Sequence, residues 1–150
     1  MTILKLTKED IPKLEQYWMN YEELKRQLTY RKYELLYQPS DSNVGGGKSN
    51  LPGNPTESEV ITLDKDKKYC NLRDTIQAIE DVYNNATDDQ RDIIGYRYWN
   101  KDLTVTTWDD IAHELTKKQE GDKVISTHSA KRIRTKILND TAVRIGWISV

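Results

Sequence analysis

Apolar side chains in the first part of the chain recur every three or four residues, which is the spacing of one face of an α-helix. The stripe runs through residues 10–37 and contains Ile11, Leu14, Trp18, Tyr21, Leu24, Leu28 and Leu35. Pro12 falls in the first turn, where its missing N–H has no intrahelical partner in any case. One long helix is therefore predicted, and its stripe needs cover from a partner helix or a second subunit.

Residues 38–56 interrupt this pattern, because they contain three prolines and four glycines. A second long helix is predicted from Thr56, which stands three residues before Glu59 as in a capping box, to Tyr83. Its candidate inner positions are Val60, Leu63, Cys70, Ile76, Ile79 and Tyr83. The two long helices are expected to form an antiparallel pair, with the charged run 64–68 on the solvated side.

Three shorter helices are predicted in the last part of the chain, over residues 88–99, 107–117 and 126–145. Thr87 and Gln90 have the spacing of a capping box at the start of the first of these. The expected core is formed by Trp99, Trp108, Ile111, Leu115, Ile133 and Ile137. The last two helices are predicted to form a helix-turn-helix. Residues 117–123 between them are longer than the usual tight turn, so this helix-turn-helix carries an insertion.

The helix predicted over 126–145 has two different faces. Ser126 is placed to cap its N-terminus, and Ala130, Ile133, Ile137 and Leu138 share an inward face. In a helix-turn-helix such a helix enters the major groove, where early residues meet base edges and later basic ones more often meet phosphate. The predicted DNA-binding residues are Ser126, Thr127, His128, Ser129, Lys131, Arg132, Arg134, Thr135 and Lys136.

Charge is segregated along the chain although the net charge is only −1. Residues 123–150 carry six Lys or Arg and one acidic residue, whereas residues 102–122 carry two Lys or Arg and six acidic residues. A protein of this balance is not expected to bind polyanions indiscriminately, and its positive charge lies where a groove-binding helix needs it. An ordinary amphipathic helix with a basic solvent face is the alternative interpretation.

No residue set predicts catalysis, a metal site or a cofactor. Cys70 is the only cysteine, and His113 and His128 lack partners at metal-binding spacing. The Gly47-Lys48-Ser49 sequence lacks the earlier glycine and the strand of a P-loop. Acidic residues come too early for a signal peptide and no segment is apolar enough to cross a membrane, so a cytoplasmic, non-enzymatic protein is expected.

These patterns predict an all-α protein with two parts. Residues 1–84 are expected to form a helical hairpin that serves in oligomerisation, with a dimer as the first expectation, and to include the loop 38–56. Residues 85–150 are expected to form the helix-turn-helix DNA-binding domain. The segment Pro39–Gly47 is expected to be an ordered turn that contacts a partner protein or phosphate, since Asp41 and Asn43 can bond a turn backbone.

Two resemblances bear on function. Ile111-Ala112 followed by Ile125-Ser126, Ala130, Ile133 and Leu138 resembles region 4 of bacterial sigma factors, apart from the insertion at 117–123. The motifs Pro39-x-Asp41-x-Asn43-Val44-Gly45-Gly46, Thr56-x-x-Glu59, Tyr96-x-Tyr98-Trp99-Asn100-Lys101 and Ser129-Ala130-Lys131-Arg132-Ile133-x-x-Lys136-Ile137 resemble the RinA family of phage late-gene transcriptional activators. This second likeness covers roughly residues 10–146.

The second resemblance implies a phage regulator that binds promoter DNA upstream of packaging and structural genes and helps host RNA polymerase to start there. It adds contact with that polymerase as the alternative role of residues 1–84, beside oligomerisation. By position it assigns base contacts to Thr127, His128, Lys131 and Arg132, and phosphate contacts to Arg134 and Lys136. Two alternatives stay open. A small terminase subunit of a DNA-packaging machine also combines a helix-turn-helix with helical oligomerisation segments, and a helical adaptor would bind protein without binding DNA.

Overall fold

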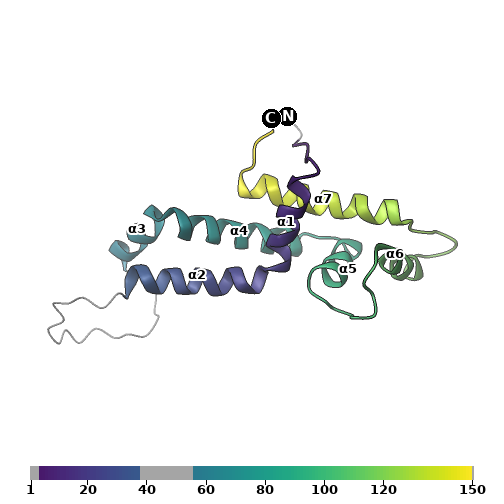
Figure 1. The fold of residues 1–150 in the computed structure, drawn as a ribbon, viewed down its shortest axis with the longest axis horizontal. Helices are drawn as coiled ribbons and strands as arrows, with labels where there is room; N and C mark the ends of the chain where they lie inside the picture. The colour runs from purple at the N-terminus through teal and green to yellow at the C-terminus, as the bar shows by residue number, and fades with distance from the viewer. Residues whose placement is uncertain (1–3, 38–55, 150) are drawn as a thin grey trace. The chain divides into compact units, whose positions relative to one another are not determined.

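The computed structural model describes residues 4–37 and 56–149. These residues form α-helices and no strand, which confirms the all-α prediction (Figure 1). The predicted loop, including the Pro39–Gly47 turn and the Gly47-Lys48-Ser49 sequence, lies outside the described residues except for Thr56. The helices are α1 Asp10–Met19, α2 Tyr21–Leu36, α3 Glu57–Lys65, α4 Lys67–Asn84, α5 Asp88–Arg97, α6 Trp108–Lys117 and α7 Thr127–Ile145.

Each of the two long predicted helices is broken once, which corrects the prediction. The first breaks at Asn20 (φ −100°, ψ 20°) between α1 and α2, and the second breaks at Asp66 (φ −86°, ψ 117°) between α3 and α4. Neither position is Pro or Gly, and the apolar spacing continues across both, so periodicity did not mark the breaks. The predicted capping boxes at Thr56–Glu59 and Thr87–Gln90 are both present.

The chain forms two compact units, and the larger of them is built from two segments that are separate in the sequence. Met1–Tyr21 and Gln77–Val150 make the larger unit, and Glu22–Ile76 makes the smaller one. Packing therefore groups the residues of α1 with the C-terminal helices, whereas the sequence analysis divided the chain after residue 84. The functional roles given to the two parts remain predictions.

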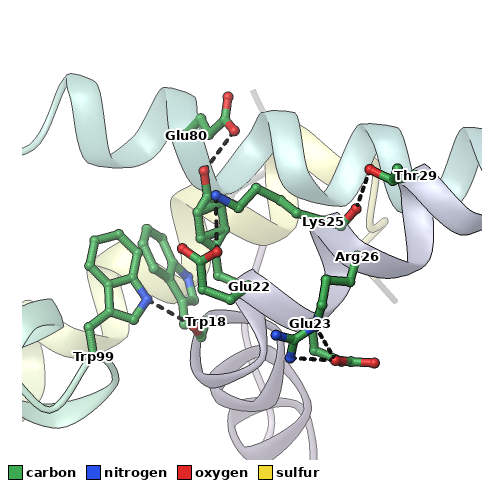
Figure 2. Close-up of polar contacts among 9 residues, drawn as sticks. Trp18, Glu22, Glu23, Lys25, Arg26, Thr29, Glu80 and Trp99 are labelled. Atoms are coloured by element: carbon green, nitrogen blue, oxygen red, sulfur yellow. Dashed lines mark hydrogen bonds and ion pairs between the residues drawn. The ribbon is translucent and has the colours of Figure 1, made fainter. Parts of the chain in front are cut away.

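The core of the larger unit is closed by α1, whose part in it the sequence analysis missed. Trp18 is fully buried, and its indole N–H donates to the hydroxyl of Thr141 in α7 at 3.1 Å. The indole N–H of Trp99 donates in turn to the Trp18 carbonyl oxygen at 3.0 Å, and the two rings lie 5.8 Å apart (Figure 2). Other fully buried side chains are Leu14, Ile79, Ile93, Ile94, Ile111, Leu115, Ile137 and Leu138. Trp99, Trp108 and Ile133, predicted for this core, are only half-buried.

The smaller unit is an antiparallel pair in which α2 lies alongside α3 and the first part of α4 (Figure 1). Leu24, Leu28 and Leu35 are half-buried and no residue of α2 is fully covered within the chain, so cover of this stripe by a second subunit stays a prediction. Val60 is exposed, whereas Leu63, Leu72 and Ile76 are buried. The Arg31 guanidinium donates to both carboxylate oxygens of Asp66, at 3.0 and 2.6 Å. The Asp66 side chain is therefore held in a contact with Arg31 and is not a solvated member of the charged run 64–68.

Candidate nucleic-acid interface

The α7 helix begins and ends at residues suited to those positions. The hydroxyl of Ser126 accepts the backbone N–H of Ser129 at 3.0 Å, which confirms the predicted N-cap. Gly146 ends the helix with φ +105°, a left-handed conformation that favours glycine. Between these ends α7 spans 19 residues, or about 28 Å.

One face of α7 is buried in the larger unit. Ala130, Ile137, Leu138, Thr141 and Ala142 are buried, and α1, α5 and α6 all pack against this helix. The opposite face carries His128, Lys131, Arg132 and Lys136, all exposed as predicted. Ser126 is also exposed, and Thr127, Ser129 and Thr135 are half-buried. Since burial of the apolar side fixes the rotation of the helix, these polar residues are held together on one face.

Ion pairing divides the five cations of α7 into two groups. Arg144 pairs with Asp81 at 3.7 Å, and Arg134 pairs with Glu15 at 3.6 Å. Lys131, Arg132 and Lys136 form no ion pair with any acid in the described part of the chain. Their charge is therefore not neutralised locally, and it makes the outward face of α7 electropositive.

Arg134 does not lie on the outward flank, which corrects the sequence interpretation. Its side chain is 14% exposed, and its guanidinium lies over the Trp108 ring at 5.2 Å. Glu15, the partner of Arg134, also accepts the hydroxyl of Tyr98 at 2.8 Å. Burial beside this carboxylate raises the pKa of Tyr98. Because α1 supplies the carboxylate, nothing within α7 itself could have shown that Arg134 is drawn inward.

All four of the predicted hydroxyl residues are already engaged within the protein. The Thr127 hydroxyl donates to the Asp109 carboxylate at 2.7 Å and so joins the start of α7 to the first turn of α6. The Ser126 hydroxyl donates to that of Ser129 at 3.0 Å, and Thr135 donates to the Lys131 carbonyl at 3.0 Å. These side chains hold local structure, and the charged residues carry the unpaired hydrogen-bonding capacity of the face.

The segment between α6 and α7 is held by Thr116, a residue that the sequence analysis did not single out. Its hydroxyl accepts the Ile125 N–H at 2.9 Å and lies 2.8 Å from the Ala112 carbonyl oxygen, to which it donates. Gly121 adopts φ +70° in this segment, whose span between the two helices agrees with the predicted insertion. A threonine near the end of a helix is common, so sequence alone carried no distinct signal for this bond.

The start of α6 is fixed by a capping box that the sequence analysis missed. The Thr107 hydroxyl accepts the Asp110 N–H at 3.1 Å, and the Asp110 carboxylate accepts the Thr107 N–H at 3.2 Å. The backbone N–H groups of Thr107 and Thr106 lower the pKa of Asp110. The cap therefore stays in its ionised, accepting form at neutral pH, and it fixes the first turn of α6.

A buried carboxylate anchors the other end of α6. Asp92 in α5 accepts the Lys118 ammonium at 2.6 Å and the Lys101 ammonium at 3.1 Å. Burial raises the pKa of Asp92, but the hydrogen bonds from the two ammonium groups outweigh burial and lower it overall. Gly95 leaves room for the Lys101 side chain, because a Cβ at position 95 would lie 2.9 Å from its Cδ.

The described residues contain no group of three or more His, Cys, Asp or Glu side chains that could hold a metal ion. His113 and His128 are both exposed, and neither forms part of a ligand set there. Among those same residues, no helix has the length and apolar character needed to cross a membrane. The candidate interface is the cationic surface of α7, against whose other side α1, α5 and α6 pack.

The protein is 27% identical over 143 residues to the transcriptional activator rinA of Staphylococcus phage phi11, and the match covers 91% of this chain and 90% of that protein. No solved structure matches the chain. Neither sequence comparison indicates an enzyme family. A family model described as a protein of unknown function (DUF722) matches residues 11–142, and the chain belongs to this family.

Proposed function

We propose that this protein is a phage-encoded, sequence-specific DNA-binding activator of late packaging and structural genes that acts with host RNA polymerase in the bacterial cytoplasm. The observation that carries the proposal is the outward face of α7, where Lys131, Arg132 and Lys136 are exposed and unpaired with any described acid. The similarity to a phage transcriptional activator supports it. The proposal includes the interpretation that α6 and α7 form a helix-turn-helix similar to region 4 of bacterial sigma factors.

The contact expected of each α7 residue follows from its position along the helix. His128, Lys131 and Arg132 lie in the first turns, which in a helix-turn-helix approach the base edges. Arginine can donate two hydrogen bonds to a guanine, and a good bidentate contact discriminates by about 1–3 kcal/mol. Lys136 lies farther along, where it is suited to a phosphate. Arg134 is left out of the contacting set because it pairs with Glu15.

The first test is selection of bound sequences from a random DNA pool, followed by binding measurements with variants of the full chain. Lys131→Ala and Arg132→Ala are expected to abolish the preference for the selected sequence without unfolding the protein, because both side chains are exposed. Lys136→Ala is expected to weaken binding to all sequences and to reduce the salt slope. Arg144→Ala removes one positive charge from the same helix at a site paired with Asp81, and it serves as the matched control.

The alternatives give different outcomes. A protein that binds no DNA at any salt concentration is an adaptor for other proteins, and ring-shaped oligomers on a packaging site indicate a terminase subunit. Transcription that depends on this protein in a purified polymerase system supports the activator. Retention of sequence preference by both the Lys131→Ala and the Arg132→Ala variants contradicts the assignment of α7 as the recognition helix.

A further inference from the structure

The residues that precede α1 lie beside the outward face of α7. Leu4, Lys5 and Leu6 line a shallow groove of about 460 Å³ together with Arg132, Lys136 and Asn139 of α7. All of these residues belong to the larger compact unit. The groove therefore joins a segment far from α7 in the sequence to the cationic face described above.

The chemistry of this groove suits an anion. Its lining contains three cations, Lys5, Arg132 and Lys136, and no acid. None of the three forms an ion pair with a described acid. Cations that share one concave surface add their potentials, so the groove attracts negative charge more strongly than a single exposed lysine does.

The segment is fixed where it joins α1. The Thr7 N–H donates to the Asp10 carboxylate at 2.8 Å, and the Asp10 N–H donates to the Thr7 hydroxyl at 3.3 Å. These bonds engage the Asp10 carboxylate in a local turn that fixes the chain just after Lys5. Lys5 itself lines the groove beside α7 and forms no ion pair with a described acid.

We propose that this groove binds a backbone phosphate of the DNA that α7 contacts, with Lys5 and Lys136 as the phosphate partners, while Arg132 adds its charge to the groove and keeps the base contact proposed above. The inference rests on the DNA binding proposed above. Lys136 lies two helical turns beyond His128, or about 12 Å along the axis. The major groove is about 12 Å wide. When the start of α7 faces the base edges, its later turns therefore lie near a bordering strand, and the groove beside them faces that strand's phosphates.

The test compares Lys5→Ala with Lys8→Ala in the full chain. Both residues are exposed lysines near the N-terminus, but only Lys5 lines the groove. Affinity for the selected DNA and for random DNA is measured across a range of salt concentrations. In Lys5→Ala the slope of log K against log salt is expected to fall in magnitude by about 0.9, with a similar loss of affinity for both DNAs. Lys8→Ala is expected to keep the wild-type slope, and Lys5→Arg is expected to restore it.

The outcomes separate this inference from the function on which it rests. An unchanged slope in Lys5→Ala, in a protein whose Arg132→Ala variant loses sequence preference, overturns the groove assignment and leaves the proposed function standing. A loss of sequence preference in Lys5→Ala without a change of slope indicates a base contact and overturns the phosphate assignment. Absence of DNA binding by the wild-type protein overturns both. Circular dichroism of each variant confirms that the helices are retained.

Discussion

The two compact units of this protein are built from the same kind of amphipathic helix, yet most of the buried side chains of the described residues lie in the larger one. In the larger unit, Trp18 of α1 and Leu138 of α7 are fully buried. In the smaller unit, α2 has no buried residue, and Tyr30 and Tyr33 are 65% and 56% exposed. Full burial of a large apolar side chain contributes about 1.5–3 kcal/mol, whereas an exposed ion pair contributes about 0–1 kcal/mol.

The two units therefore have different sources of stability. The larger unit can hold α7 rigidly from within, which a surface that reads base edges requires. The smaller unit relies on a limited apolar contact and on polar bonds such as that between Arg31 and Asp66. Its exposed aromatic face is suited to a contact outside the chain, and oligomerisation through this part of the chain stays a prediction.

The largest effect is expected from removing the side chain that closes the core. Trp18→Ala deletes a fully buried indole and its bond to Thr141, so the free energy of unfolding should fall by about 3–5 kcal/mol. Tyr33→Ala in α2 removes another aromatic side chain, but from an exposed site, and should cost less than about 0.5 kcal/mol. Urea denaturation followed by circular dichroism measures both, and equal losses would contradict the contrast between the units.

A second comparison removes one carboxylate charge from each unit. Glu15→Gln leaves Arg134, whose buried Nε already lacks a partner, without a counter-charge, and should cost about 1–3 kcal/mol. Glu34→Gln removes a longer pair, 3.8 Å from Arg31, and should cost less than about 1 kcal/mol. The same denaturation measurement applies. A smaller loss for Glu15→Gln than for Glu34→Gln would show that Arg134 is not held by this carboxylate.

The exposed face of α2 is predicted to pair with a second copy of the chain. Tyr30 and Tyr33 line a shallow groove with Glu22, Arg26 and Thr29, and a twofold axis would bring the same tyrosines of two chains together. Tyr30→Lys with Tyr33→Lys should raise the dimer dissociation constant at least tenfold, or about 1.4 kcal/mol. Leu103→Lys changes an exposed leucine of the larger unit and serves as the control. Light scattering that shows a wild-type monomer well above micromolar concentration refutes this prediction.

The capping boxes of α6 and α3 allow the same substitution to be compared in the two units, with smaller expected effects. Thr107→Ala removes the cap of α6 in the larger unit and should lower its stability by about 1 kcal/mol. Thr56→Ala removes the same motif from α3 in the smaller unit and should reduce helix content locally, with a smaller shift of the main unfolding transition. Amide hydrogen exchange locates each effect. A Thr56→Ala variant that destabilises α6 and α7 would show that the units unfold together.

The smallest effect is expected at acid pH. Hydrogen bonds from Arg31 and from the Tyr69 N–H lower the pKa of Asp66 from 3.8 to about 2. Because the folded pKa is depressed, this contact contributes fully above about pH 4 and is lost as the pH falls through about 2. Arg31→Gln should move the Asp66 titration back towards 3.8, as followed by carboxyl NMR. A midpoint that is the same in both proteins would exclude Arg31 as the cause.

Local patterns in the sequence were enough to predict most helices. The three C-terminal helices, the Ser126 cap and the capping boxes at Thr56 and Thr87 depend on residues within a few positions of each other, and all are present. The exposure of Lys131, Arg132 and Lys136 was predicted for the same reason. Periodicity failed at Asn20 and Asp66, where the helices break while the apolar spacing continues.

The sequence by itself determined the helical content and which side of α7 is apolar, since helical spacing and capping are local properties. Only the tertiary structure decided what each face meets. Trp18 covers Thr141, 123 positions away, and Glu15 draws Arg134 inward from the basic face. Lys5 comes to lie in one groove with Lys136. Such contacts depend on how separate helices pack, and no local spacing encodes which distant side chain will supply the partner.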